Sequence, residues 1–461
     1  MSFSRASALL GSVVAVAFAA SASGAPSGVE WTRFGYDAAR SGSGPAVTGI
    51  TAANVGRLRR IQVRLDGTAD SSPVYADGLF VVTTSYGKTI AVDAATGRIR
   101  WRFTPPGYSS WAGTDQITES SPLTDGRWVY AAAPNGRIYK LDLRTGRQRW
   151  SVAITRLPGR EKIGTALNLS RGLVLATTGG HFGDAPPYQG HVAAIDTSSG
   201  RLVHVWNALC GDRPGLLDPK TCRQSGAAIW ARSGAIVEPG SGKLLVATGN
   251  GNWNGSTDWG DSVLELSLDA GRLLQNWTPV NQHKLESTDT DLGSTAPALL
   301  GSGLAVQGGK DAILRLLDLR RLNGTGTAAA RTGGELQRLP TPGGQSLFSA
   351  PAVWRSGGRT WLFVSDFSAT GGYVLSGRRL QMVWTQNFGG TSPVVAGGLL
   401  YVYDPGGGGL RVVQPATGAV VATLPAGSGH WNSPIVIDGR IALPEGNANK
   451  HHLSGVLDIW R

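Results

Sequence analysis

The amino-acid sequence predicts an all-β protein, an eight-bladed β-propeller whose blades are four-stranded antiparallel sheets. Three observations lead to this fold: the composition, a pattern that recurs eight times, and a second pattern that follows most copies of the first. The chain has 461 residues, of which 66 are glycine, 24 are proline and only 16% are charged. Such a chain is too apolar to be disordered and too rich in glycine to be mainly helical, so many short strands joined by turns are expected.

The recurring pattern begins with a small polar residue, often followed by proline, and continues with apolar residues, a turn and an apolar strand. Clear copies are SSPVYADGLFVVTT from Ser71 and SSPLTDGRWVYAAA from Ser120. Each copy has the strand and turn residues that are typical of a β-hairpin. The remaining copies begin at Gly164, Ser233, Ser294, Ser349, Thr391 and Asn432.

The second pattern is a strand, a tight turn and another strand that often contains tryptophan. It is plainest in IAVDAATGRIRWRF from Ile90 and YKLDLRTGRQRWSV from Tyr139. Two hairpins per unit make a four-stranded sheet, and such a sheet covers both of its faces by packing between neighbours in a closed ring. We therefore expect Trp101 and Trp150 to pack between blades, and the last strand to pair with the beginning of the chain.

The N-terminal residues have the layout of a secretory signal. Arg5 precedes a mostly apolar run from Ala8 to Ala20, and Ala20-Ser21-Ala22 resembles a cleavage site with small residues. Residues 1–22 are expected to be a signal peptide, and residues 23–461 to form a single propeller domain in a secreted or periplasmic protein. No later segment reaches the ~18 apolar residues of a membrane span, so none is expected.

The two cysteines, Cys210 and Cys222, bracket a loop rich in proline and glycine. In an exported chain a disulfide is more probable chemistry for them than a metal pair. Closing so short a loop contributes roughly 3 kcal/mol in the chain-entropy model. The formal net charge of +12 comes mostly from scattered arginines, and no basic patch is interleaved with aromatic residues, so nucleic acid is not an expected partner.

The turn DAATGRIRW resembles the signature of the pyrroloquinoline-quinone (PQQ) repeat, which builds the propellers of quinoprotein dehydrogenases. The stretches WTRFGYDAARSGSG from Trp31 and ITAANVGRLRR from Ile50 look like that family's N-terminal segment. The repeat is specific for the fold rather than for activity, because non-catalytic relatives carry it too. The resemblance implies PQQ at one end of the central channel, a calcium or lanthanide ion that polarises its reactive carbonyl, and an aspartate that takes the proton of an alcohol.

Four stretches resemble the family's site. ATGNGNWNGSTDWGDS places Asn250 where an amide oxygen binds the metal, and in STDTDLGSTAP Asp289 matches the catalytic base and Asp291 a further metal ligand. Two carboxylates spaced by one residue point the same way on an extended backbone. Lys310 in VQGGKDAIL matches the cation that contacts the quinone oxygens, and Trp230 in SGAAIWARSG matches the ring on which the quinone stacks. The plainer interpretations are a Gly/Asn-rich turn around Asn250, a solvated turn at the two aspartates and a solvated side chain for Lys310.

One stretch departs from the family's pattern. In TGGHFGDAPPYQG, His181 stands where the resemblance places a metal-binding glutamate, and imidazole is a poor substitute for a carboxylate on calcium. Asp184 is close enough in sequence to replace it. The family's adjacent cysteine pair is absent from TDQITESSP, while Glu119 and Asp70 lie near the expected site.

Two functions remain open. The first is a PQQ-dependent alcohol dehydrogenase with a degenerate metal site, closest to polyvinyl-alcohol-type enzymes, acting on an alcohol or polyol and passing electrons to a separate acceptor because the chain has no Cys-x-x-Cys-His motif. The second is a non-catalytic scaffold that binds a protein partner, similar to the propeller of the outer-membrane assembly machinery. The order Trp230, Asn250, Asp289, Asp291, Lys310 agrees with the enzyme family and favours the first.

Overall fold

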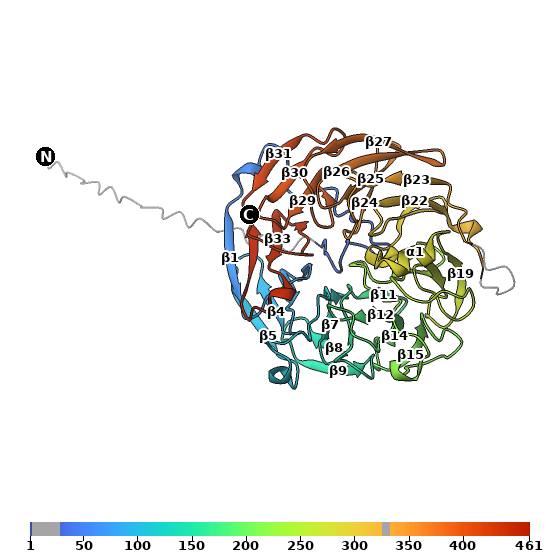
Figure 1. Cartoon of the computed structure of the whole chain (residues 1–461). Helices are drawn as coiled ribbons and strands as arrows, with labels where there is room; N and C mark the ends of the chain where they lie inside the picture. The colour runs from blue at the N-terminus through green and yellow to red at the C-terminus, as the bar shows by residue number, and fades with distance from the viewer. Residues whose placement is uncertain (2–27, 325–331) are drawn as a thin grey trace.

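The computed structural model describes residue 1, residues 28–324 and residues 332–461. It confirms the eight-bladed propeller, because eight four-stranded antiparallel sheets form a ring (Figure 1). The expected signal peptide lies outside the described residues, apart from Met1. In the described part of the chain, no helix is long and apolar enough to cross a membrane.

The blades are numbered in chain order, and each begins with its innermost strand; the first strands of several neighbouring blades contact one another, as those of blades 1 and 2 do. Blade 1 contains β2 (Val74–Ala76), β3 (Leu79–Thr83), β4 (Thr89–Asp93) and β5 (Ile99–Phe103); blade 2 contains β6 (Leu123–Thr124), β7 (Trp128–Ala133), β8 (Arg137–Asp142) and β9 (Gln148–Ala153); blade 3 contains β11 (Asn168–Ser170), β12 (Leu173–Thr177), β14 (His191–Asp196) and β15 (Leu202–Asn207); blade 4 contains β16 (Ile236–Val237), β17 (Leu244–Ala247), β18 (Val263–Leu266) and β19 (Leu273–Trp277).

The second half of the ring repeats this order. Blade 5 contains β20 (Ala298–Gly301), β21 (Leu304–Gln307), β22 (Ile313–Asp318) and β23 (Gln337–Pro340); blade 6 contains β24 (Ala352–Ser356), β25 (Arg359–Ser365), β26 (Thr370–Ser376) and β27 (Arg379–Gln386); blade 7 contains β28 (Val394–Ala396), β29 (Leu399–Asp404), β30 (Gly409–Val413) and β31 (Val420–Leu424); blade 8 contains β32 (Ile435–Ile437), β33 (Arg440–Glu445), β34 (Gly455–Trp460) and β1 (Arg60–Leu65).

Short elements lie between the blades' strands. The strands β10 (Glu161–Lys162) and β13 (Gly179–Gly180) pair with each other, and α1 (Gln282–Ser287) precedes blade 5. Single-turn 3₁₀ helices occur at Val55–Arg57, Tyr108–Ser110, Pro219–Thr221, Leu292–Ser294, Leu319–Arg321 and Ala448–Lys450.

The ring closes as the sequence predicts, with a strand from each end of the chain in blade 8. β1 pairs antiparallel with β34, from Arg60 opposite Trp460 to Leu65 opposite Gly455. This arrangement satisfies the backbone groups of β34 and leaves the N-terminal strand at the outer edge.

The repeated tryptophans pack between blades, also as predicted. The indole N–H of Trp101 in blade 1 donates to the Leu143 carbonyl of blade 2 at 2.8 Å, and that of Trp150 in blade 2 donates to the Thr197 carbonyl of blade 3 at 3.1 Å. Gly146 has a positive φ of 71° in the turn that meets the Trp101 ring, and a Cβ there would overlap the ring. A turn that ends in glycine, Gly146 in blade 2 and Gly200 in blade 3, is therefore the docking surface for the tryptophan of the preceding blade.

The N-terminal segment, residues 31–48, closes one end of the central channel. Its carbonyls accept hydrogen bonds from backbone amides at or just after the inner strands of six blades. One void between this segment and the inner strands, lined by Trp31, Phe34 and Arg40 among others, has a volume of only about 10 Å³. The donor and acceptor pairs are Tyr75 to Trp31, Thr124 to Thr32, Val237 to Ala38, Val353 to Ser41, Val395 to Gly42 and Gly439 to Thr48.

Arg40 is the central residue of this closure and is 3% exposed. Its guanidinium donates to the carbonyls of Phe34, Ala166, Leu167 and Ser233 at 2.6 to 3.2 Å. Burial and then the charge of a neighbouring arginine lower the pKa of Arg40 to about 9. The buried cation is therefore stabilised by main-chain carbonyl groups of the segment itself and of two neighbouring blades.

Candidate functional site

A cavity of about 620 Å³ opens at the end of the ring opposite the N-terminal segment. Its walls include residues just before the inner strands, whose far ends bind that segment. All six residues that the sequence analysis proposed for metal, cofactor or catalysis line this one cavity, although they come from separate stretches of the chain: His181, Trp230, Asn250, Asp289, Asp291 and Lys310.

Aromatic rings form an apolar surface in the cavity. Phe348 lies between Trp230 and Trp431, with ring centroids 5.8 and 5.2 Å apart. The planes of Phe348 and Trp431 are inclined by 25°, and Phe348 also meets the exposed Phe367 at 5.1 Å. Such a surface suits the face of a planar aromatic molecule.

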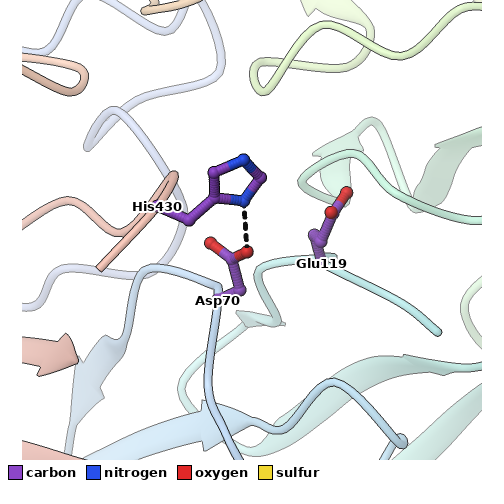
Figure 2. Close-up of side chains that lie close together, drawn as sticks. All are labelled: Asp70, Glu119 and His430. Carbon is purple, nitrogen blue, oxygen red and sulfur yellow. Dashed lines mark hydrogen bonds and ion pairs between the residues drawn. The ribbon is translucent and has the colours of Figure 1, made fainter. Parts of the chain in front are cut away.

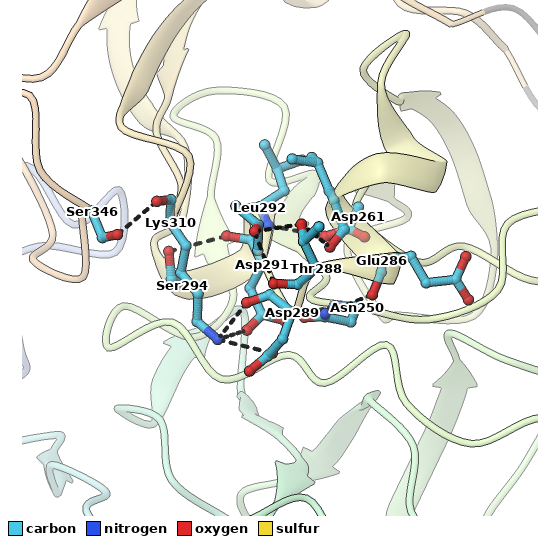
Figure 3. A network of polar contacts seen from close by, with 12 residues as sticks. Asn250, Asp261, Glu286, Thr288, Asp289, Asp291, Leu292, Ser294, Lys310 and Ser346 are labelled. Carbon is cyan, nitrogen blue, oxygen red and sulfur yellow. Dashed lines mark hydrogen bonds and ion pairs between the residues drawn. The ribbon is translucent and has the colours of Figure 1, made fainter.

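Lys310 joins the two aspartates that follow α1 (Figure 3). Its Nζ lies 3.2 Å from Asp289 Oδ1, forms a closer ion pair with Asp291 Oδ2, and sits 5.5 Å from the centroid of the Trp230 ring. The Asn250 backbone N–H donates to Asp291 Oδ1 at 2.7 Å. Burial alone would lower the pKa of Lys310, but Asp291 and Asp289 raise it above its ordinary value, so the lysine is charged.

The two aspartates do not share an extended backbone, which corrects the sequence-based expectation. Asp289 follows the short helix α1 and has a φ of 52°, in the left-handed region, whereas Asp291 has a φ of −51° and a ψ of 124°. Their environments differ as well, since the side chain of Asp289 is 77% exposed and that of Asp291 is 8% exposed. Both still reach Lys310, because the chain turns between them.

Two features behind the cavity fix Asp291. A side chain at Gly249 would overlap Asp291 Oδ1, so the Gly-Asn pair of the sequence motif lets this carboxylate approach the backbone. Asp261, which is fully buried, accepts the Leu292 N–H at 3.0 Å. Burial, together with the charge of Asp291, raises the pKa of Asp261 to about 8, so this carboxyl is protonated at neutral pH.

His181 and Asp184 have different surroundings. The His181 Nε2–H donates to the Pro158 carbonyl at 3.0 Å, and its buried Nδ1 has no hydrogen-bond partner among the described residues. Burial lowers the pKa of His181, so the ring is neutral. Asp184 instead faces the aspartate side: burial, and then repulsion from Asp291, raise its pKa. Asp184 therefore lies close enough to Asp291 for their charges to interact, whereas no hydrogen bond or ion pair links the His181 side chain to Asn250 or Asp291 in the described part of the chain.

The opposite wall of the cavity comes from blades 8, 1 and 2 (Figure 2). His430 Nδ1 lies 2.7 Å from Asp70 Oδ2. Glu119 forms an ion pair with Lys162 at 3.1 Å, in which both side chains are about one-tenth exposed. Ligand atoms of Asp70, Glu119 and His430 all lie within 4.8 Å of one another.

The cavity is also lined by four residues for which the sequence led to no expected role: Lys162, Phe348, His430 and Trp431. A positional signal exists for some of them. The residue three positions before the proline of the repeat is Asp70, Glu119, Phe348 and Trp431 in blades 1, 2, 6 and 8. Because this position directly precedes the inner strand, a functional residue there points to the mouth of the channel.

Cys210 and Cys222 form a disulfide in the structure, with Cα atoms 6.0 Å apart. The bridge closes a loop after β15 and lies apart from the residues that line the cavity. It therefore belongs to the loop structure at the edge of blade 3.

The repeat is also recognised by comparison with known proteins. A family model of PQQ repeats, described as outer membrane protein assembly factor BamB, matches residues 35–208 and 109–267, which together are half of the chain. The chain therefore belongs to the family of PQQ-repeat propellers.

The relatives found by sequence are enzymes of that family. The chain is 29% identical over 276 residues to quinohemoprotein alcohol dehydrogenase ADH IIB of Pseudomonas putida, covering 53% of this chain and 39% of that protein. It is 26% identical over 276 residues to the dehydrogenase subunit of alcohol dehydrogenase (quinone) of Acetobacter aceti, covering 50% and 36%. The match thus spans less than two fifths of these relatives' length.

Solved structures support the fold alone, because their identity to this chain is low. The quinohemoprotein alcohol dehydrogenase of Comamonas testosteroni superimposes with a TM-score of 0.69 at 17% identity, covering 94% of this chain and 80% of that one. BamB of Moraxella catarrhalis superimposes with a TM-score of 0.53 at 15% identity, covering 88% and 99%.

Proposed function

We propose that the protein is a quinoprotein-like oxidoreductase that binds PQQ and a calcium or lanthanide ion and oxidises an alcohol or polyol. One observation carries this proposal. Residues that resemble the site of quinoprotein dehydrogenases come from separate stretches of the chain and line a single cavity of about 620 Å³. A scaffold that binds only through its outer surface has no need of this convergence.

The cavity fits the quinone in two respects. The aromatic surface of Trp230, Phe348 and Trp431 suits a planar ring system. Lys310 and Lys162 supply cationic groups for the quinone oxygens and for the carboxylates that PQQ carries. When bound, PQQ supplies a two-electron acceptor, and its electrons would leave to a separate acceptor.

The donor set also fits a hard cation. The Asn250 amide and the carboxylates of Asp291 and Asp184 are oxygen donors of the kind that calcium and lanthanide ions prefer. The raised pKa of Asp184 reflects repulsion from Asp291 in addition to burial, and a bound cation would relieve that repulsion. Lys310 already compensates Asp289 and Asp291, so the metal would compete with an ammonium for Asp291. His181 supports this set only indirectly, through its place beside Asp184.

The alternative function is a non-catalytic scaffold that binds a protein partner. The description of the matching family model favours it, since that description names an assembly factor. The scaffold function gives no reason for charged residues to be held around a cavity at the channel mouth.

Quinone retention separates the two functions. Purified protein is mixed with PQQ and either Ca²⁺ or Eu³⁺ and passed through a gel-filtration column, and the quinone absorption and metal content of the protein fraction are measured. The enzyme proposal expects about one quinone per chain, lost at least ~10-fold in Lys310→Gln and Trp230→Ala.

Lys88→Gln is the matched control. Lys88 also pairs with an aspartate, Asp66 at 3.2 Å, and lies over an aromatic ring, Tyr108 at 4.7 Å, but it does not line the cavity. This variant should retain quinone like the wild type. If the wild type retains no quinone with either ion, the enzyme proposal fails and the scaffold function takes its place.

A further inference from the structure

The wall of the cavity that the family resemblance does not cover holds a histidine–carboxylate pair. His430 precedes β32 and Asp70 precedes β2, and they are 360 residues apart in the sequence. In space, His430 Nδ1 lies 2.7 Å from Asp70 Oδ2 (Figure 2). Blades 8 and 1 are neighbours in the closed ring, so ring closure creates the pair.

Asp70 is held as a carboxylate. Its side chain has no exposed surface, and it accepts the backbone N–H groups of Trp431 at 2.8 Å and of Ala448 at 3.0 Å. Burial alone would raise the pKa of Asp70, but His430, the buried Arg232 and the Ala448 amide lower it below its ordinary value. An ionised carboxylate only accepts, so the imidazole places its proton on Nδ1.

In its neutral form, His430 therefore presents a lone pair on Nε2. Its side chain is about one-fifth exposed and lines the cavity, while Asp70 lies behind it. No hydrogen bond joins Nε2 to any of the residues that the structure describes. The ring packs against Trp431 with centroids 4.3 Å apart, which limits its rotation. A buried carboxylate that fixes the tautomer of an imidazole facing a cavity is the arrangement of a general base.

Asp289, the residue that the family resemblance implies as the catalytic base, is less suited to accept the proton of the alcohol. Asp289 is ion-paired to Lys310 at 3.2 Å, and its side chain is 77% exposed. The Lys310 ammonium already contacts one of the carboxylate oxygens of Asp289, and surrounding water competes with a substrate hydroxyl for both.

We propose that His430, held by Asp70, is the proton acceptor for the alcohol oxidised in this cavity. The inference rests on the proposed oxidoreductase function. In the step, the substrate O–H bond breaks and its proton moves to His430 Nε2, while the hydride of the neighbouring C–H bond leaves to the quinone oxidant and the carbonyl forms. Asp70 is a positioning residue, because it acts through the imidazole.

A metal ion bound by Asp70, Glu119 and His430 is the competing interpretation, since their ligand atoms are close together. The charges favour the base. Lys162 already pairs with Glu119, and the Arg232 guanidinium, which donates to the Asp70 carbonyl at 3.0 Å, lies beside the Asp70 carboxylate. A divalent cation would therefore enter a group of two carboxylates that two fixed cations already neutralise.

The first test needs no substrate. ¹⁵N NMR of the imidazole nitrogens in histidine-labelled protein reports the tautomer, and His430→Gln assigns the His430 signals. The proposal expects a proton on Nδ1 and none on Nε2, and it expects Asp70→Asn to change this tautomer distribution. A proton on Nε2 in the wild type overturns the proposal. So does Mn²⁺ binding in a calorimeter that is lost in Glu119→Gln, because the metal would then occupy the imidazole.

The second test uses protein loaded with PQQ and Ca²⁺, with ethanol, glycerol and polyvinyl alcohol as probes and an artificial electron acceptor. His430→Gln is expected to lower kcat by roughly 10²–10⁴-fold while quinone retention stays within about twofold of wild type. Asp289→Asn should lower kcat less than His430→Gln does. The matched control is His204→Gln, which removes a histidine paired with Asp269 at 3.2 Å on the outer strand of blade 3.

The outcomes separate this inference from the proposed function. Activity within threefold of wild type in His430→Gln overturns the base and leaves the oxidoreductase intact. Absence of quinone retention in the wild type refutes the oxidoreductase and the base together. If quinone is retained but none of the three alcohols is oxidised, the NMR result decides: a lone pair on Nε2 supports the base, and a proton there overturns it.

Discussion

The two ends of the central channel differ in the surroundings of their charged side chains. At the closed end, the buried cation Arg40 is surrounded by four carbonyl oxygens. At the open end, carboxylates and ammonium groups face one another around a cavity; burial and Asp291 raise the pKa of Asp184, and the aspartates raise that of Lys310. The same eight blades thus provide a closed end whose polar groups are satisfied and an open end whose charges remain available to a ligand.

The largest expected effect is at the closed end. Arg40→Met removes the donors of four hydrogen bonds and leaves buried carbonyls of Phe34, Ala166, Leu167 and Ser233 without them. We expect the free energy of unfolding to fall by about 3–5 kcal/mol, measured by urea denaturation followed by tryptophan fluorescence.

The control for this variant is Arg57→Met, which changes an exposed arginine further along the N-terminal region. It should stay within about 0.5 kcal/mol of wild type. A small effect of Arg40→Met, equal to that of the control, would show that the closure does not depend on its buried cation.

The second prediction concerns acid. His191 in β14 is buried, its Nε2–H donates to the Ile154 carbonyl at 2.6 Å, and burial lowers its pKa to about 4. Between about pH 6.5 and pH 4 the unfolded chain binds a proton that the folded chain excludes. The contribution of His191 to the free energy of unfolding is therefore complete above about pH 6.5. It falls by about 3 kcal/mol as the pH drops toward 4.

His191→Gln should flatten the dependence of stability on pH in this window, whereas His204→Gln, an exposed histidine, should leave it unchanged. Arg40 has a pKa of about 9, so this residue does not titrate in that window. An unchanged slope in His191→Gln would mean that other groups cause the acid loss.

The fold could be predicted because its determinants are local. Each inner strand begins near a small polar residue that is often followed by proline, and a turn that ends in glycine receives a tryptophan of the preceding blade; both features lie within short stretches and recur around the ring. The site residues around the two aspartates, Asn250, Asp289, Asp291 and Lys310, could be predicted because each lies in a stretch that resembles a family motif. Their conformation could not, since the short helix α1 places Asp289 in a left-handed turn.

The opposite wall escaped prediction because its partners are distant in sequence. Asp70 and His430 are 360 residues apart and Glu119 and Lys162 are 43 residues apart, so no motif contains either pair. The choice between His181 and Asp184 depends on how one loop folds over the cavity, and His181 turns to the Pro158 carbonyl. Such information lies in tertiary packing rather than in residue spacing.

The third prediction tests that choice at the open end. Asp184→Asn removes a carboxylate that faces Asp291 and should weaken Tb³⁺ binding about 10-fold, which corresponds to about 1.4 kcal/mol. His181→Gln should change the affinity less than twofold. Binding is followed by Tb³⁺ luminescence sensitised by tryptophan, with Asp212→Asn, an exposed aspartate away from the cavity, as the control. If His181→Gln weakened Tb³⁺ binding more than Asp184→Asn did, His181 rather than Asp184 would be the metal ligand.

The smallest expected effect distinguishes two neighbours at the open end. Asp289 is mostly exposed, and its ion pair with Lys310 is screened by water, so Asp289→Asn should change the free energy of unfolding by less than about 0.5 kcal/mol. Asp291 is nearly buried and accepts the Asn250 N–H, so Asp291→Asn should cost about 1–3 kcal/mol. Urea denaturation at pH 7 measures both. Equal losses of the free energy of unfolding would show that Asp289 shares the structural role of Asp291. The contrast between structural charges and available charges would then hold only between the two ends of the channel, and not between neighbours within the cavity.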